Sequence, residues 1–155
     1  SGCRRDNNHN FEVTTMNTAI ATVLEAYRTA VLTRDVDGLA ALYHPDARIF
    51  DAWGTWSYEG RDAWRKPLDA WLTSNRDEEY RAALDDVQVI EGTDMAVLTA
   101  IATYSGWSAD GKQLRALQNR LSWVLKRDGA AWTIVHEHTS SPLGFEDGKG
   151  ILQRN

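Results

Sequence analysis

The first patterned stretch of the chain has apolar residues at helical spacing. From Asn17 to Val31 apolar side chains recur every three or four residues, which predicts a helix with one buried face. A polar break at residues 34–38 ends this pattern. Residues 39–43 are expected to form a short second helix, which the following His-Pro pair ends.

Residues 47–72 are predicted to contain a short strand, a turn-rich passage and a helix. Residues 47–51 are predicted to form a short strand, and residues 53–58 form a turn-rich passage with two tryptophans. A third helix is expected to begin after Gly60. Its apolar face carries Trp64, Leu68, Trp71 and Leu72.

After Arg76 the hydrophobic period becomes two, which predicts strands. Four long strands are expected, at residues 80–90, 95–107, 113–126 and 131–140. Short Gly- and Asp-containing segments between them are typical of β-hairpin turns. Helices followed by an antiparallel meander predict an α+β fold, in which a strongly curved sheet wraps around the helices and encloses a cavity.

Composition narrows the function classes. At 155 residues, with 43% hydrophobic and 25% charged side chains, the chain is long enough for one domain with a core. A net charge of −5 argues against a nucleic-acid partner, since phosphate backbones are bound by an excess of Lys and Arg. No stretch is apolar enough to predict a membrane span. Seven Trp, five Tyr and three Phe favour an aromatic pocket or interface.

The two ends of the chain are expected to lie outside the folded domain, which is predicted at residues 16–142. Residues 1–15 are interpreted as a non-native or flexible extension, with a native start at Met16 and a cytoplasmic location. The alternative is an exported or lipid-anchored protein in which Cys3 is a processed lipoprotein cysteine. This single cysteine excludes an intramolecular disulfide and a cysteine-based zinc site. Residues 143–155 carry little apolar pattern and are expected to form a mobile tail.

Three segments together resemble a known family: residues 34–43 (RDVDGLAALY), 47–54 (ARIFDAWG) and 127–142 (RDGAAWTIVHEHTSSP). With the order of elements, they are similar to the nuclear transport factor 2-like superfamily. This superfamily includes ketosteroid isomerase, the SnoaL-like polyketide cyclases and the association domain of calcium/calmodulin-dependent kinase. The resemblance implies a cone-shaped α+β barrel over about residues 17–142, with three N-terminal helices packed in a strongly curved antiparallel sheet. The fold hosts many activities, so it identifies a function poorly.

The resemblance implies two catalytic residues. Asp51 falls where ketosteroid isomerase has the carboxylate that moves a proton between two carbons, and burial would raise its pKa toward useful base strength. Tyr27 matches the helix tyrosine that donates to the developing oxyanion. Asp51 could instead cap a turn or pair with an arginine, and Tyr27 could simply be core. Two departures from the isomerase pattern are Ala52, where that enzyme has proline, and the absence of a second oxyanion donor.

His136 and His138 are further catalytic candidates. Strict alternation places them on one strand face with Trp132, Ile134 and Ser140, and the resemblance implies that this face looks into the cavity. Two imidazoles there could relay protons, orient a water molecule or bind an anion. The alternative is that they bond backbone groups and tyrosine hydroxyls. A histidine pair on a strand can also ligate a metal, with Asp51 as a third ligand, but three convergent ligands are the minimum for such a site, and neither a metal nor a cofactor is expected.

The orientation of Arg120 depends on the register of the last hairpin. A three-residue turn that pairs Lys126 with Ala130 would place Arg120 and Ser122 on the same face as His136. A two-residue turn at 128–129 would point Arg120 outward. The resemblance favours the inward orientation, in which a buried Arg120 needs a carboxylate or an anionic ligand. The expected ligand-binding residues are Trp53 and Trp56 at the cavity mouth, with Tyr43, Arg120, Ser122 and Ser140.

Two main functions follow from these residues. The first is cofactor-free proton transfer, of the isomerase, cyclase or dehydratase type, on a small apolar or aromatic substrate. The alternative is a non-catalytic ligand-binding or association domain that grips a small organic acid through Arg120 and the two histidines. A purely structural oligomer is a third possibility. Tryptophans on the outer sheet face would be exposed in a monomer, so a homodimer or higher homo-oligomer through that face is expected.

Overall fold

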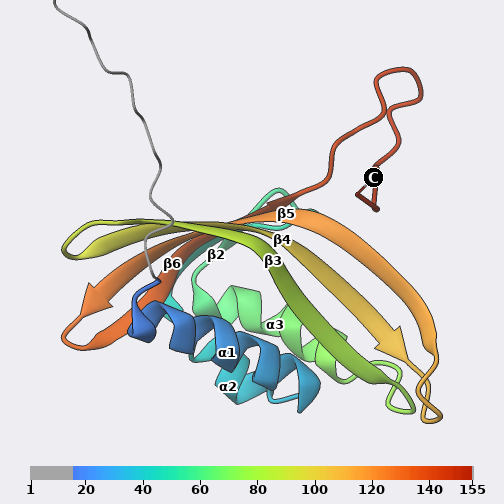
Figure 1. Cartoon of the computed structure of the whole chain (residues 1–155), viewed down its shortest axis with the longest axis horizontal. Helices are drawn as coiled ribbons and strands as arrows, with labels where there is room; N and C mark the ends of the chain where they lie inside the picture. The colour runs from blue at the N-terminus through green and yellow to red at the C-terminus, as the bar shows by residue number, and fades with distance from the viewer. Residues whose placement is uncertain (1–15, 155) are drawn as a thin grey trace, which may run out of the picture.

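Three helices lie against the concave face of one strongly curved sheet in the computed structural model, which describes residues 16–154 (Figure 1). The helices are α1 (Thr18–Leu32), α2 (Val36–Ala40) and α3 (Arg61–Leu72). Helix α1 begins at the N-cap Asn17, whose side chain accepts a hydrogen bond from the Ala19 amide. None of the helices in this part of the chain is long and apolar enough to cross a membrane.

Six strands form the sheet in the order β2-β1-β6-β5-β4-β3. All neighbouring pairs are antiparallel except β1 and β6, which run parallel. The combination of N-terminal helices and a curled, mainly antiparallel sheet confirms the predicted α+β cone. The strands are β1 (Tyr43–Phe50), β2 (Tyr58–Glu59), β3 (Glu79–Glu91), β4 (Met95–Trp107), β5 (Gln113–Asp128) and β6 (Ala131–Ser140).

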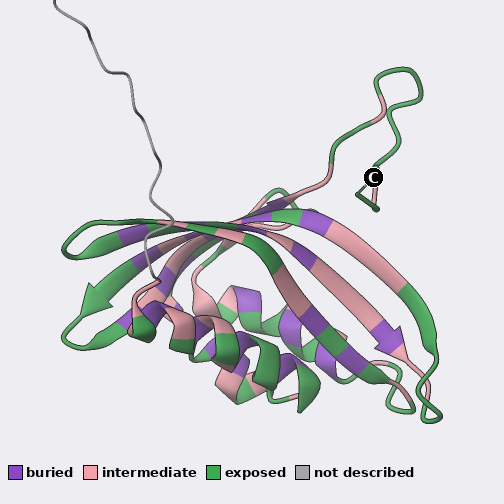
Figure 2. Cartoon of the chain, viewed as in Figure 1, coloured by how far each residue is buried: buried purple, intermediate pink, exposed green. Residues whose placement is uncertain are grey.

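The core fills the space between the helices and the concave sheet face. Buried positions alternate with exposed ones along the strands (Figure 2), as expected for a sheet with one covered face. Helix α1 contributes Ile20 and Val31, while the sheet contributes Leu98, Trp123 and Ile134, all of them fully buried. Trp123 packs edge to face against the Tyr27 ring, with 5.3 Å between the ring centroids.

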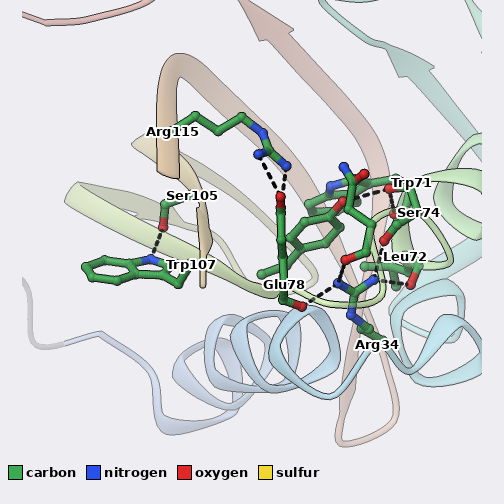
Figure 3. Close-up of polar contacts among 10 residues, drawn as sticks. Arg34, Trp71, Leu72, Ser74, Glu78, Ser105, Trp107 and Arg115 are labelled. Atoms are coloured by element: carbon green, nitrogen blue, oxygen red, sulfur yellow. Dashed lines mark hydrogen bonds and ion pairs between the residues drawn. The ribbon is translucent and has the colours of Figure 1, made fainter. Parts of the chain in front are cut away.

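Arg34 fastens the α1–α2 junction to the loop between α3 and β3 (Figure 3). Its backbone has a positive φ of 55°, and its guanidinium lies 4.1 Å from the centroid of the Tyr80 ring. The same guanidinium donates four hydrogen bonds of 2.6 to 2.9 Å to the carbonyl oxygens of Leu72, Ser74, Asn75 and Glu78. One side chain therefore contacts four backbone carbonyl oxygens and one aromatic ring.

Helix α2 and the start of strand β1 differ from the predicted bounds by three or four residues. Helix α2 begins at Val36 instead of residue 39, because Asp35 caps it by accepting a hydrogen bond of 2.9 Å from the Gly38 amide. Strand β1 begins at Tyr43, inside the predicted second helix, because this residue pairs with Ile134 of β6. A long-range partner therefore overrides the local pattern at this point.

A β-bulge in β6 changes which side chains face the core. Leu125 pairs with Ile134, but the preceding residue Val124 pairs with His136, which leaves Val135 as an extra residue. Before the bulge Ile134 is buried under the concave face, and after it Glu137 and Thr139 are buried instead. The strict alternation assumed for this strand is therefore wrong beyond Ile134.

The hairpin between β5 and β6 follows neither predicted register. Asp128 pairs with Ala131, so the two turn residues are Gly129 and Ala130. The glycine has a φ of 64°, a left-handed conformation that suits glycine.

The C-terminal segment, expected to be a mobile tail, turns back on itself. Leu143 and Gly150 form an isolated bridge, and Figure 1 shows this hairpin on the side of the sheet away from the helices. Leu152 then lies beside β5, where its carbonyl oxygen accepts a 2.7 Å hydrogen bond from the Gln118 amide. The predictions for residues 1–15, including a processed Cys3, fall outside the described residues.

Candidate functional site

A cavity of about 390 Å³ opens between α1, α3 and the concave face of the sheet. Its volume lies within the range of small-molecule pockets. Aromatic side chains form most of its wall, namely Tyr27, Trp53, Tyr58, Trp64, Trp71 and Tyr104. Polar groups interrupt this wall, among them the hydroxyls of two tyrosines, two carboxyls, a threonine hydroxyl and an amide.

Glu137 is a buried carboxyl in the cavity wall, only 3% exposed. Its Oε1 accepts two hydrogen bonds, one of 2.6 Å from the Tyr43 hydroxyl and one of 2.8 Å from the Trp123 indole N–H. Burial raises the pKa of Glu137 to about 7, although these two donors oppose the rise and the nearby Asp51 adds to it. A carboxyl of this kind exchanges its proton near neutral pH.

Asp51 lies next to Glu137 on the cavity wall, at the end of β1. Its Oδ1 accepts a 3.0 Å hydrogen bond from the Thr139 hydroxyl, and this threonine is on the same face of β6 as Glu137. The threonine oxygen also accepts a bond of 2.9 Å from the Ala52 amide. Partial burial raises the pKa of Asp51, and the hydrogen bond from Thr139 limits the rise.

Two tyrosine hydroxyls meet at the cavity wall. The hydroxyl oxygens of Tyr27 on α1 and Tyr104 on β4 are 2.7 Å apart. Burial raises the pKa of both phenols above their ordinary value, and both therefore stay protonated at neutral pH. One of the two hydroxyls can donate to the other, which leaves a proton available to a molecule in the cavity.

Two buried polar atoms of the wall have no hydrogen-bond partner among the described residues. They are Oδ1 of Asn119 and the indole Nε1 of Trp64. Buried polar groups in folded proteins are almost always bonded, so each of these atoms is available to a ligand or a water molecule.

The lining residues of this cavity include no Lys, Arg or His. They include two carboxyls, both with raised pKa values. An organic acid bound here would meet negative charge without a compensating cation, whereas a neutral molecule with an aromatic or apolar body fits the wall.

The structure brings two of the four predicted catalytic residues, Asp51 and Tyr27, to this cavity. The expectation that His136 and His138 face it is wrong, because the bulge at Val135 turns both onto the convex face of the sheet. There His136 lies 2.6 Å from the carbonyl oxygen of Arg48, measured from Nδ1.

On that convex face, Phe50 packs edge-on against the rings of both histidines, with centroids 5.1 and 5.5 Å away. Since Asp51 belongs to the other face, the metal-binding set of Asp51 and two histidines does not form. Within residues 16–154 no group of three His, Cys, Asp or Glu side chains could hold a metal ion.

The predicted ligand-binding residues divide between the two faces. Arg120, Ser122 and Ser140 share a face with His136, as one predicted register had it, but this face is the convex one. The inward orientation expected for Arg120 is therefore wrong, and its Nε donates a 3.1 Å bond to the Ser140 hydroxyl instead. The two-residue turn is the cause, because it pairs Leu125 with Ile134 and so places Leu121, Trp123 and Leu125 on the concave face, which leaves Arg120 pointing outward, the orientation that the two-residue alternative predicted.

Of the aromatic candidates, Trp53 lines the cavity and is half exposed, in keeping with a position at its mouth. Trp56 is 98% exposed and is not part of the wall. Tyr43 is buried behind the wall, where it contacts Glu137 instead of the cavity. Among the sheet tryptophans, Trp123 and Trp132 are buried in the core, which removes them as a reason for a sheet-face dimer.

Sequence reasoning missed Glu137. Strict alternation places it on the strand face opposite to the histidines, away from the expected cavity face. Only the pairing with β5 shows the bulge that brings it inward.

Comparisons with known proteins agree with this geometry. Among curated proteins there is no significant match. A protein from Pseudomonas putida KT2440, described as NTF2-like and of unknown function, is similar over 91% of this chain and 99% of its own, with 23% identity and a TM-score of 0.78. ActVI-ORFA from Streptomyces coelicolor is similar over 79% of this chain and 94% of its own, with 16% identity and a TM-score of 0.70.

A candidate calcium/calmodulin-dependent protein kinase II association domain from Xanthomonas campestris is similar over 78% of this chain and 84% of its own. The identity is 20% and the TM-score 0.66. At these identities the similarities show a shared fold. The family profile of the SnoaL-like domain matches residues 20–144, which is most of the chain. The chain therefore belongs to the SnoaL-like domain family, and its fold is of the nuclear transport factor 2-like type.

Proposed function

We propose that the protein is a cofactor-independent enzyme that moves protons on a small, uncharged, largely apolar or aromatic substrate. Isomerisation, cyclisation and dehydration are the reactions of this class. The observation that carries the proposal is Glu137, a buried carboxyl with a pKa of about 7 in the wall of an aromatic cavity. Such a group costs stability when it is ionised, so it is more typical of a reactive site than of a core.

The two carboxyls have different surroundings and therefore different roles. Asp51 is partly exposed and accepts a bond from Thr139, so at neutral pH it is the more ionised of the pair. It is the group that removes a proton from a substrate carbon and returns it at a second position. Glu137, still largely protonated near pH 7, donates to the substrate oxygen on which negative charge develops. Environments that separate two carboxyls in this way are typical of acid–base pairs.

The remaining polar groups support the same chemistry. The hydroxyl pair of Tyr27 and Tyr104 offers a second donor to a developing negative charge. Asn119 presents a polar atom that has no hydrogen-bond partner in residues 16–154 and can orient the substrate. The aromatic wall keeps water away from the reacting atoms, which strengthens each of these interactions.

The alternative, a domain that grips an organic acid in this cavity, has less support. The three side chains on which it depended, Arg120, His136 and His138, lie on the convex face. The cavity itself carries two carboxyls and no cationic lining residue.

The test is deuterium exchange from D2O into a panel of neutral cyclic enones and hydroxylated aromatic ketones, followed by proton NMR. We expect exchange or isomerisation with the wild type and a loss of about 100-fold or more in Asp51→Asn and Glu137→Gln. The rate should fall as the pH rises through about 7, because Glu137 loses its proton there. Glu59→Gln, an exposed carboxylate paired with Arg48, is the matched control and should react like the wild type.

Two outcomes would contradict the proposal. Full exchange rates in Glu137→Gln would show that this carboxyl takes no part. Binding of the same compounds without any exchange at any pH would favour a ligand-binding domain instead.

A further inference from the structure

A second cavity, of about 350 Å³, lies on the convex side of the sheet between β4, β5 and the C-terminal segment. Its lining differs from that of the first cavity, because it has cationic groups and no carboxylate. Two arginines and three side-chain amides meet three apolar side chains there: Arg120 and Arg154, Gln118, Asn119 and Gln153, and Ile101, Pro142 and Ile151.

The C-terminal segment forms one wall of this cavity because β5 holds it in place. The backbone N–H of Gln118 donates a 2.7 Å bond to the Leu152 carbonyl oxygen. The backbone N–H of Arg154 donates a 2.7 Å bond to the side-chain Oε1 of the same glutamine. The glutamine is itself anchored, since its Nε2 donates a 3.0 Å bond to the Thr103 hydroxyl. Arg154 of the tail and Arg120 of the strand therefore line the same cavity.

The two guanidinium groups are incompletely neutralised. Arg120 donates to the neutral hydroxyl of Ser140 and makes no ion pair within the described residues. Arg154 pairs with Asp86 at 3.3 Å, but both side chains are half exposed and such a pair is weak. Two cations and one carboxylate leave a local positive charge on a protein whose net charge is −5.

We propose that this cavity binds a small organic anion, with its carboxylate or phosphate between Arg120 and Arg154 and its apolar part against Ile101, Pro142 and Ile151. A guanidinium presents parallel N–H donors that match the oxygens of either group. The volume of about 350 Å³ is at the lower end for small-molecule sites. The anion would join the sheet to the C-terminal segment, so its binding strengthens the contact of that segment with β5.

Isothermal titration with benzoate, phenyl phosphate and neutral benzamide tests the proposal in the full-length protein. We expect saturable binding of at least one anion and none of benzamide, which has the same shape without the charge. Comparison of benzoate with phenyl phosphate distinguishes a carboxylate site from a phosphate site. Arg120→Gln and Arg154→Gln should each weaken binding by about tenfold or more, because each removes half of the cationic pair.

Arg81→Gln is the matched control, since Arg81 is a half-exposed arginine paired with Glu79 on β3, outside the cavity lining. It should bind as tightly as the wild type. Amide NMR shifts locate the ligand, and those of Gln118 and Arg154 should move most. Equal binding of benzamide, unchanged affinity in both arginine variants, or shifts centred on Glu137 and Thr139 would each overturn the proposal. Because Arg154 lies beyond the last strand, its variant remains informative even if Arg120→Gln folds poorly.

Discussion

The Tyr43 hydroxyl donates a 2.6 Å hydrogen bond to Oε1 of Glu137, which joins the first residue of β1 to the buried carboxyl of β6. The Trp123 indole donates to the same oxygen, so one oxygen of the carboxyl faces the core and is fully occupied. Burial favours the neutral acid, while these two donors favour the carboxylate. The balance between them determines where the group titrates.

Glu137 should make the stability of the protein depend on pH. Its pKa is raised from 4.5 to about 7, so its stabilising contribution is complete below about pH 4.5 and is lost as the pH rises through about 7. The difference between these pKa values corresponds to about 3 kcal/mol. Glu137→Gln should therefore unfold at higher urea concentration than the wild type at pH 8. At pH 5 the two proteins should have nearly the same free energy of unfolding. If this free energy changed with pH by the same amount in both proteins, the assignment would be contradicted.

Tyr43→Phe should raise the pKa of Glu137 further, because the phenol no longer stabilises the carboxylate. Carbon-13 NMR of the glutamate carboxyls measures this directly. Tyr58→Phe is the matched control, since Tyr58 lines the same cavity and makes no hydrogen bond to Glu137. A titration of Glu137 that is identical in all three proteins would show that the bond has no influence.

The hydrogen bond from Thr139 should lower the pKa of Asp51. The threonine hydroxyl lowers a pKa that burial raises, so Thr139→Val is expected to move the pKa of Asp51 upward. Thr139→Ser keeps a hydroxyl at the same place and should titrate like the wild type. The carboxyl signal of Asp51 followed by NMR from pH 3 to pH 8 distinguishes the variants. If Asp51 titrated at the same pH in the Thr139→Val and Thr139→Ser variants, the hydrogen bond from Thr139 would have no influence on its pKa.

Arg34 should be a major contributor to stability. Arg34→Lys keeps the charge but cannot make the four carbonyl bonds or lie flat on Tyr80, and we expect a loss of about 2 to 4 kcal/mol in urea unfolding. Arg65→Lys is the control, because Arg65 makes an exposed ion pair with Asp37, a kind that contributes about 1 kcal/mol or less. Equal effects of the two substitutions would exclude the special role of Arg34.

The long elements could be predicted because their patterns are regular. Strand β4 has the predicted bounds, since each side of a half-buried strand repeats its polarity every two residues. Strand β6 also has its predicted bounds, although the bulge breaks this repeat inside the strand. A short second helix was predicted, but its bounds and the start of β1 could not be, because a five-residue helix has too few positions for a period and Tyr43 is held by a distant partner, Ile134. Local pattern carries no information about that pairing.

The candidate site was predicted in part. Asp51 and Tyr27 came from the resemblance to ketosteroid isomerase, and both line the cavity. Glu137 was missed and the two histidines were placed on the wrong face, because a one-residue shift exchanges the two faces of a strand. Nothing in the order of residues 131–140 distinguishes a bulged strand from a regular one; the difference lies in the hydrogen bonds with β5.

The extra residue Val135 has a consequence for how relatives of this chain are compared. A relative whose last strand has no bulge would carry its inward carboxyl one position nearer to the strand start. An alignment without a gap would then match that carboxyl to His136, and the two acids would look unrelated. Placing a gap at Val135 would bring them together, so the position of one insertion decides whether a shared acid is recognised among distant members of the family.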